Sequence, residues 1–215
     1  MAARSLCLTT RIYIHGLFLY NLLVDLRAAR ERLGLTQGRV AELLGTSQAN
    51  VSAYETGRLT PGPTVASRIA AFTALPDDTI YRDLWPPTLA STAMHLREDI
   101  HTGVSEGDML RVIIQASDDF PKLTSPAERA FFLSEPGVTG DARFDALLAG
   151  LAVHLCREAG MESTPAWTRT PGRMLDEIWW FDSPAPSLHA LGLRDAVPAM
   201  RARGVMFSRR NLESV

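Results

Sequence analysis

Residues 36–57, TQGRVAELLGTSQANVSAYETG, decide the fold of the N-terminal part of this chain. Thr36 and Ser47 are of the residue types that favour the N-cap position of a helix, because their side chains accept hydrogen bonds from free backbone N–H groups. Gly45 stands between them, where a residue in the left-handed conformation ends a helix without steric cost. The stretch therefore predicts two short helices with a tight connection between them.

The apolar residues of the same stretch complete the pattern of a helix-turn-helix motif. Val40, Leu43 and Leu44 follow the helical period in the first of the two helices. Short helices joined so tightly must cross steeply, which requires a small side chain at the crossing, and Ala41 meets that need. Val51 is placed to fill the angle between the helices. We expect the second helix to be the one that faces a ligand.

Three further helices are predicted around the motif. The first covers residues 26–34 and ends at a glycine, the fourth lies within 61–75, and a short fifth lies within 77–87. The residues expected in the core of this part are Leu26, Leu33, Val65, Ile69 and Phe72.

This part of the chain resembles the Cro/CI-type helix-turn-helix family, also called the XRE family, over about residues 23–75. The matching segments are GLTQ at 34–37, GTSQ at 45–48, and Glu55, Gly57 and Pro61 of an E-x-G-x-x-x-P pattern. The resemblance implies a five-helix domain that binds double-stranded DNA. It also implies that Arg30 on the first helix pairs with Glu55 at the end of the third, whereas two solvated surface charges are the alternative.

The family's recognition helix enters the major groove by its N-terminal half, which assigns the DNA contacts. The expected base contacts are Gln48, Ala49, Asn50, Ser52 and Ala53. Glutamine and asparagine can each bond adenine twice, while alanine touches only a thymine methyl group. The other expected DNA contacts are Ser47, which caps the helix, and the phosphate contacts Gln37, Arg39, Thr56 and Arg58. For the two arginines, a solvated charge is the alternative.

The distribution of charge permits DNA binding without establishing it. The chain has 215 residues, 46% hydrophobic and 21% charged, and a net charge of -2. Residues 1–75 contain eight Arg against four acidic residues, a net charge of +4, which leaves -6 for the remainder. This bias is weaker than that of strongly basic nucleic-acid-binding domains. The two cysteines are far apart and form no metal-binding spacing, which fits a reducing, cytoplasmic setting.

Residues 1–22 are expected to be an N-terminal extension outside the domain. The apolar run within 12–24 lacks a small-residue cleavage pattern and is too short to span a membrane, so we expect neither a signal peptide nor membrane contact. The extension is either an arm without fixed structure or a stretch upstream of the native translation start near Val24.

The remainder of the chain, residues 88–215, predicts a second helical domain, so the fold class is all-α. The pair Pro86–Pro87 marks the boundary, and residues 23–87 form the DNA-binding domain. Helices are predicted within 88–103, 105–120, 125–136 and 141–160. The last has a wide apolar face, formed by Phe144, Leu147, Leu148, Leu151 and Leu155, that serves either as internal core or as a dimer contact.

Chemical signals in this second domain are weak. We find no catalytic constellation, phosphate-binding glycine loop, cofactor motif or metal-ligand cluster. The segment IWWF at 178–181 is more typical of a buried aromatic anchor than of an exposed hot spot. The segment 201–210 carries four arginines that either contact nucleic acid or an acidic partner or form a solvated face: Arg201, Arg203, Arg209 and Arg210.

Two classes of function remain. The first is a DNA-binding regulator, a homodimeric repressor whose second domain dimerises or holds a protein partner. That domain resembles the C-terminal regions that follow this motif in actinobacterial regulators and antitoxins, which implies a toxin as one such partner. The second class is an enzyme or effector-sensing protein that carries the motif as a targeting module. The missing catalytic constellation favours the first class, with no enzymatic activity.

Overall fold

The computed structural model describes residues 25–75, 88–181 and 185–212. The predicted fifth helix within 77–87 and the expected N-terminal extension lie outside the described residues. Most of the described chain is helical, so the prediction of a helical protein with an N-terminal helix-turn-helix is confirmed.

The chain divides into two compact units, Met1–Trp85 and Pro86–Val215. None of the helices in the described ranges combines the length and the apolar character that crossing a lipid bilayer requires.

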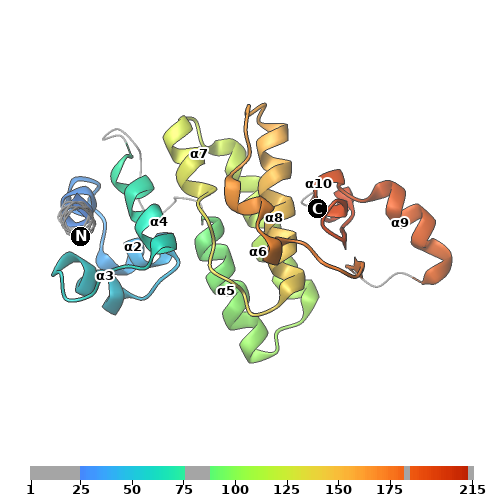
Figure 1. Cartoon of the computed structure of the whole chain (residues 1–215), viewed down its shortest axis with the longest axis horizontal. Coiled ribbons are helices and arrows are strands. Elements are labelled where there is room, and N and C mark those ends of the chain that lie inside the picture. Colours follow the sequence, from blue (N-terminus) through green and yellow to red (C-terminus); the bar gives the residue numbers. More distant parts are fainter. Residues whose placement is uncertain (1–24, 76–87, 182–184, 213–215) are drawn as a thin grey trace, which may run out of the picture. The chain divides into compact units, whose positions relative to one another are not determined.

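The first unit begins with helical residues 25–32 and continues with three labelled helices (Figure 1). These are α2 (Gln37–Leu44), α3 (Gln48–Glu55) and α4 (Pro63–Thr73).

The turn between α2 and α3 has the predicted chemistry. The Thr36 side chain accepts a hydrogen bond from the backbone N–H of Arg39, and Ser47 accepts one from that of Asn50. Gly45 ends α2 with a φ of 61°, in the left-handed region. Local sequence therefore determines where both helices of the motif begin and where the first one ends.

The core of the first unit is built largely from the predicted residues. Leu26, Val51 and Ile69 are fully buried, whereas Leu33 and Val65, both predicted in the core, are only half-buried. Arg68 on α4 was not predicted to be inside. Its Nη1 donates a hydrogen bond of 2.7 Å to the backbone carbonyl of Leu44, the last residue of α2. An arginine from another helix thus satisfies a carbonyl that α2 leaves without an intrahelical partner.

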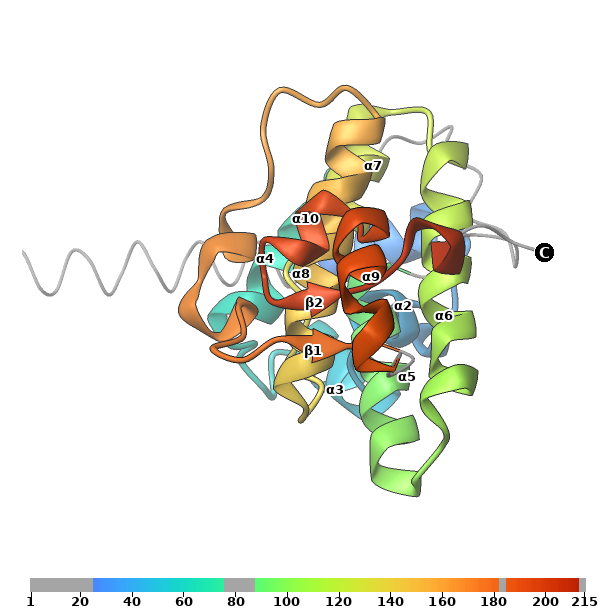
Figure 2. The ribbon, with the colours of Figure 1, turned by 90° about the vertical axis from the view of Figure 1, so that its right-hand side faces the viewer.

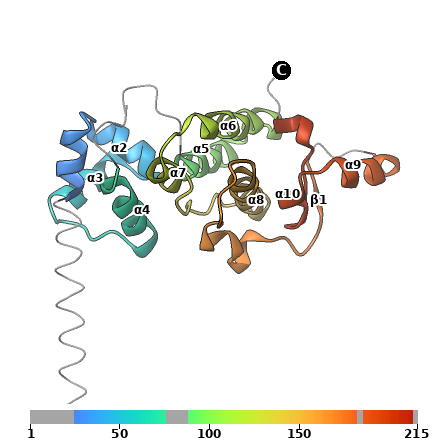
Figure 3. The same cartoon turned by 90° about the horizontal axis from the view of Figure 1, so that it is seen from above.

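The described residues of the second unit form three longer helices and a series of shorter elements (Figures 1 and 3). The longer helices are α5 (Leu89–Thr102), α6 (Glu106–Asp119) and α8 (Ala142–Glu158), and the short helix α7 (Pro126–Phe132) lies between α6 and α8 in the chain. The shorter elements are the 3₁₀ turns η1 (Phe120–Lys122), η2 (Ala166–Arg169), η3 (Pro171–Arg173), η4 (Pro186–Leu188) and η5 (Arg209–Leu212), the helices α9 (His189–Asp195) and α10 (Pro198–Arg201), and the strands β1 (Trp179–Trp180) and β2 (Val205–Met206).

Helix α8 is the centre of the second unit. It contacts α5, α10, β2, η2 and η3, and Figure 3 shows it among the other elements of this unit. The five apolar residues predicted on one face of this helix are all buried within the single chain. The alternative that this face is a dimer contact is therefore wrong, because a buried face is not available to a partner.

Helix α10 crosses α8 at very short range. A Cβ atom added to Gly150 of α8 would lie 2.7 Å from Cγ and 2.9 Å from Cα of Met200 on α10. Contacts this short between carbon atoms are repulsive. The packing of α10 on α8 therefore requires a glycine at this position.

A buried ion pair holds the loop before α8. The Arg173 Nη2 donates to the carbonyl of Pro136 at 2.8 Å, and its Nη1 lies 3.5 Å from Oδ1 of Asp145. The same Asp145 oxygen accepts the backbone N–H of Thr139 at 2.8 Å. Both charged side chains are almost fully buried, so each depends on the other for a counter-charge.

One short strand pair departs from the purely helical prediction. β1 and β2 pair in parallel, with Trp179 opposite Val205 and Trp180 opposite Met206. Figure 2 looks onto this pair, with α9 in front of it. The two-residue strands are too short to produce the alternating pattern from which a strand is predicted, so the sequence contains no usable signal for them.

Candidate nucleic-acid interface

The N-terminal ends of α2 and α3 lie next to each other at the surface of the first unit. A Cβ atom added to Gly38, in the first turn of α2, would lie 4.0 Å from Oε1 of Gln48, the first residue of α3. Gly38, Ser47 and Gln48 are all exposed. The free N–H groups and the positive dipole ends of two helices therefore share one surface region, which suits an anionic ligand such as a phosphate backbone.

A buried carboxylate fixes the far end of α3. The Glu55 side chain has 0% of its surface exposed. Arg30 donates to both of its oxygens, from Nε to Oε1 at 2.6 Å and from Nη2 to Oε2 at 3.1 Å. Gln37 Nε2 donates to Oε2 at 3.0 Å, and Nε of Arg27 lies 3.5 Å from the same oxygen. The pair implied by the resemblance is thus present and ties α2 and α3 to residues 25–32.

The ionisation of this pair follows from its contacts. Burial by itself raises the pKa of Glu55, but the hydrogen bonds from Arg30 and Gln37 and the charges of Arg30 and Arg27 outweigh it and hold the pKa below its usual range. The hydrogen bond to Glu55 raises the pKa of Arg30. Glu55 therefore carries its charge at neutral pH without presenting it to an approaching phosphate.

The predicted base contacts differ in how far they face solvent. Gln48 and Ala49 are exposed, while Asn50, Ser52 and Ala53 are half-buried. Because they are the exposed side chains at the start of α3, Gln48 and Ala49 are the most accessible of the predicted base contacts.

Asn50 has a partner within the chain. Its Nδ2 donates to Oγ1 of Thr46 in the preceding turn at 3.0 Å. The Asn50 carboxamide is therefore held against the turn. Asn50 can bond adenine twice only in an orientation that this bond to Thr46 allows.

The predicted phosphate contacts on α2 also have partners within the chain. Gln37 donates to Glu55, and Arg39 Nη1 donates to Oε2 of Glu42 at 2.6 Å. An amide nitrogen carries two protons and a guanidinium carries five, so each side chain retains donors beyond these bonds. Phosphate contact by Gln37 and Arg39 remains a prediction.

Thr56 and Arg58, the predicted phosphate contacts after α3, are both exposed. The Thr56 hydroxyl donates to the carbonyl of Ser52 at 2.8 Å and accepts a hydrogen bond from Arg58 Nε at 3.0 Å. A hydroxyl has a single proton, so Thr56 can donate to phosphate only by giving up the bond to Ser52. Arg58 is therefore the stronger candidate of the two, held in place by Thr56.

Sequence reasoning missed several residues that shape this surface. Arg27 reaches the Glu55 carboxylate, Thr46 holds Asn50, and Gly38 leaves the space in which Gln48 lies. Arg27 and Glu55 are separated by a turn and two helices, so no local pattern marks their contact. Thr46 lies four residues before Asn50, and this spacing is the one signal available in the sequence.

Comparison with known proteins identifies this region. Residues 22–81 match the family model described as a helix-turn-helix domain. No curated protein and no solved structure matches the chain. The first unit thus contains a helix-turn-helix domain, and its features are consistent with a Cro/CI-type DNA-binding domain.

Proposed function

We propose that this protein is a sequence-specific DNA-binding regulator that acts in the cytoplasm as a homodimeric repressor. The observation that carries the proposal is the surface on which the N-termini of α2 and α3 meet, with Gln48 exposed at its centre. In this arrangement α3 enters the major groove, and the first turn of α2 faces the phosphate backbone. The proposal assigns no catalytic step to the protein.

Gln48 is proposed as the principal base-contacting residue. Among the predicted base contacts it combines exposure with a side chain able to accept from and donate to an adenine edge. Ala49 adds an apolar contact to a thymine methyl. With two alanines among the five predicted base contacts, sequence-dependent DNA shape contributes to specificity as well.

The experiment is selection of binding sites from a pool of randomised duplexes, followed by titration of the selected site and of a random duplex. Gln48→Ala is expected to cost about 1 to 3 kcal/mol on the selected site and little on the random duplex. Gln115→Ala, an exposed glutamine in the second unit, is the matched control. Failure to enrich any sequence, or equal loss on both duplexes, contradicts base recognition by Gln48.

Arg58 is proposed as a phosphate contact. Arg58→Ala is expected to weaken binding to the selected and random duplexes alike, and to reduce the slope of log affinity against log salt by about 1. Arg111→Ala, an exposed arginine in the second unit, is the control for the change in net charge. Loss confined to the selected site would show that Arg58 contacts a base instead.

The antitoxin form of this proposal adds a protein partner. It requires the same DNA contact and a toxin bound by the second domain, residues 88–215. The identity of the neighbouring reading frame distinguishes the two forms, because a short toxin-like gene beside this one supports the antitoxin and a metabolic operon supports an ordinary repressor. Co-purification of the neighbouring product with the full chain is the direct test.

A further inference from the structure

Helix α9 carries leucines that the chain itself does not cover. It has seven residues and no buried side chain. Leu191 and Leu193 on this helix, and Leu188 just before it, are 46%, 38% and 51% exposed. A helix this short is not stable by itself in water and depends on packing. Packing within the chain accounts for only one side of α9.

That side is held by Trp180 of β1 and by Arg201, whose Nη1 donates to the carbonyl of Leu193 at 2.9 Å. A Cβ atom added to Gly192 would lie 2.8 Å from Cζ3 of Trp180, so the backbone of α9 lies directly on the indole. His189 stacks on the same ring system, with ring centroids 3.8 Å apart and planes inclined by 10°. β1 therefore holds α9 in place, while the leucines remain exposed.

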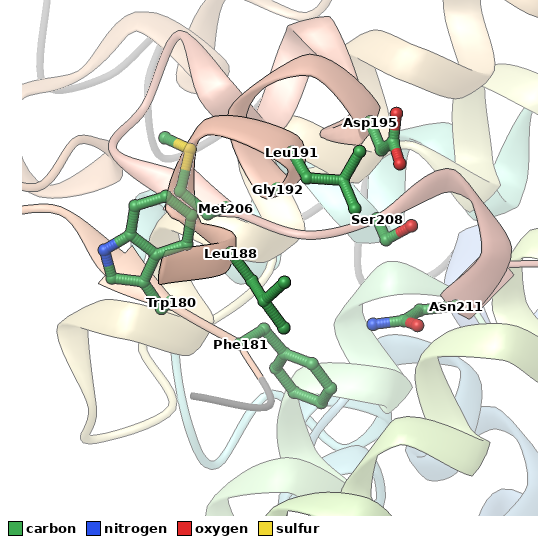
Figure 4. Close-up of a pocket in the computed structure, with 9 residues that line it drawn as sticks. All are labelled: Trp180, Phe181, Leu188, Leu191, Gly192, Asp195, Met206, Ser208 and Asn211. Carbon is green, nitrogen blue, oxygen red and sulfur yellow. The ribbon is translucent and has the colours of Figure 1, made fainter. Parts of the chain in front are cut away.

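Leu188 and Leu191 border a hollow in the same surface (Figure 4). Trp180, Phe181, Leu188, Leu191 and Met206 are its apolar lining. Its volume of about 190 Å³ is sufficient for a few apolar side chains. Its polar lining, Asp195, Ser208 and Asn211, lies on one side in Figure 4.

We call the surface formed by the exposed Ile178, Leu188 and Leu191 and the half-buried Trp180 the outer face. Ile178 directly precedes β1, and Trp180 is the last residue of that strand. Ile178 is 55% exposed. The prediction of a buried aromatic anchor at IWWF therefore holds for Phe181, whereas Trp179 and Trp180 are half-buried and Ile178 is exposed.

Charged residues of opposite sign flank the outer face at its two ends. Asp176 and Glu177 directly precede β1, and Arg209 and Arg210 follow β2 by three and four residues. Because β1 and β2 are parallel, the acidic residues lie at one end of the pair and the arginines at the other. All four are exposed, and none has an ion-pair partner among the described residues.

This arrangement is complementary to itself under a two-fold rotation. In an isologous dimer, each surface element of one copy meets its counterpart on the other. A two-fold axis that lies in the interface, perpendicular to the line joining the two charged ends, brings apolar surface against apolar surface and places the acidic end of each copy against the arginine end of the other. An unrelated partner needs no such symmetry of charge.

We infer that the outer face is the dimer interface of this protein and that its occupant is a second copy of the same chain. The inference deepens the proposed function and rests on it in one respect: a helix-turn-helix domain binds one half-site, and a two-fold operator calls for two copies. The geometry and charge of the outer face support a dimer interface independently of DNA binding. Arg209 and Arg210, both exposed, then pair with Asp176 and Glu177 of the other copy. The expectation for Arg203 changes, because this arginine bonds the carbonyls of Ala199 and Thr168 within the chain.

The first test is the mass of the full chain in solution by light scattering. The wild type is expected at twice the chain mass, and Leu191→Glu at the chain mass, because a carboxylate in the interface would be buried without a partner. Val138→Glu is the matched control, since Val138 is 61% exposed and lies outside the outer face. It should remain dimeric. Circular dichroism checks that both variants keep the wild-type helical content.

The second test exchanges the charges and does not depend on the apolar substitution. Arg209→Glu with Arg210→Glu gives a chain that is acidic at both ends, and Asp176→Arg with Glu177→Arg gives a chain that is basic at both ends. Each double variant alone is expected to be monomeric because like charges meet across the axis. An equimolar mixture of the two is expected to recover the dimer mass, because each acidic end then meets a basic one.

A monomeric wild type, a dimeric Leu191→Glu variant, or a mixture of the charge variants that stays monomeric would each overturn the inference. Titration of the same samples with the selected duplex separates this result from the proposed function. If the Leu191→Glu variant binds the selected duplex tightly and is still a dimer, the proposed interface is refuted and the proposed function is not. A dimer that is lost as expected, in a protein that binds no duplex, refutes the proposed function alone.

Discussion

Removal of Arg30 tests how the helix-turn-helix domain is held together. Arg30→Met deletes two hydrogen bonds, of 2.6 and 3.1 Å, to a carboxylate whose side chain is 0% exposed. Breaking one partner out of a buried ion pair costs about 3 to 5 kcal/mol. Gln37 and Arg27 remain near the Glu55 carboxylate, so we expect a loss near the lower limit, about 3 kcal/mol. In a domain of this size that lowers the melting temperature by more than about 10 °C.

Calorimetry of the full chain is the assay, because it separates the transitions of the two units if they unfold independently. Arg27→Met is the matched control. Arg27 also approaches the Glu55 carboxylate, at 3.5 Å, but its side chain is 50% exposed, so its removal should cost less than about 1 kcal/mol. Arg30→Met and Glu55→Gln should not be additive in the double variant, since the two residues share one interaction. Additive losses, or equal losses for Arg27→Met and Arg30→Met, would refute the reasoning.

The same cluster predicts a dependence on pH. Glu55 has a lowered pKa in the folded protein, so its contribution to stability is complete above the usual glutamate pKa and is lost as the pH falls through the folded pKa. The melting temperature of the first unit should therefore fall more steeply with acid in the wild type than in Glu55→Gln. Parallel curves would show that Glu55 does not titrate as described.

Two further predictions concern the second unit. Gly150→Ala should lower the free energy of unfolding of this unit by about 1 to 3 kcal/mol, because the new Cβ lies 2.9 Å from Cα of Met200. Gly172→Ala is the control and should be nearly neutral, because no atom lies within 4 Å of its added Cβ. Urea titration followed by tryptophan fluorescence measures both variants, and equal effects would contradict the close packing of α10 on α8. Arg173→Met should lower the free energy of unfolding by about 3 to 5 kcal/mol in the same assay, because the buried Asp145 carboxylate loses its counter-charge. A loss below about 1 kcal/mol would mean that water or the Thr139 N–H is enough to stabilise the charged carboxylate.

The sequence alone determined the helical elements that depend on neighbouring residues. Thr36 and Ser47 cap their helices as predicted, and Gly45 ends α2, because a cap involves atoms only a few residues apart. The apolar periodicity likewise located α5 to α8 within the predicted ranges. The candidate base contacts follow from the same local pattern, since a helix N-terminus identifies its own first turn.

Only the tertiary structure decided which of these side chains are available and which are already bonded. Gln37 contacts Glu55 across 18 residues, Arg68 reaches a carbonyl 24 residues away, and Arg173 reaches one 37 residues away. The exposure of α9 depends on what packs against it, which no periodicity in seven residues can specify. Contacts between distant parts of the chain depend on how helices pack together, and the same local sequence is compatible with several packings. The helix caps and the turn can therefore be predicted from the sequence, whereas the partners of the buried charged side chains are known only from the tertiary structure.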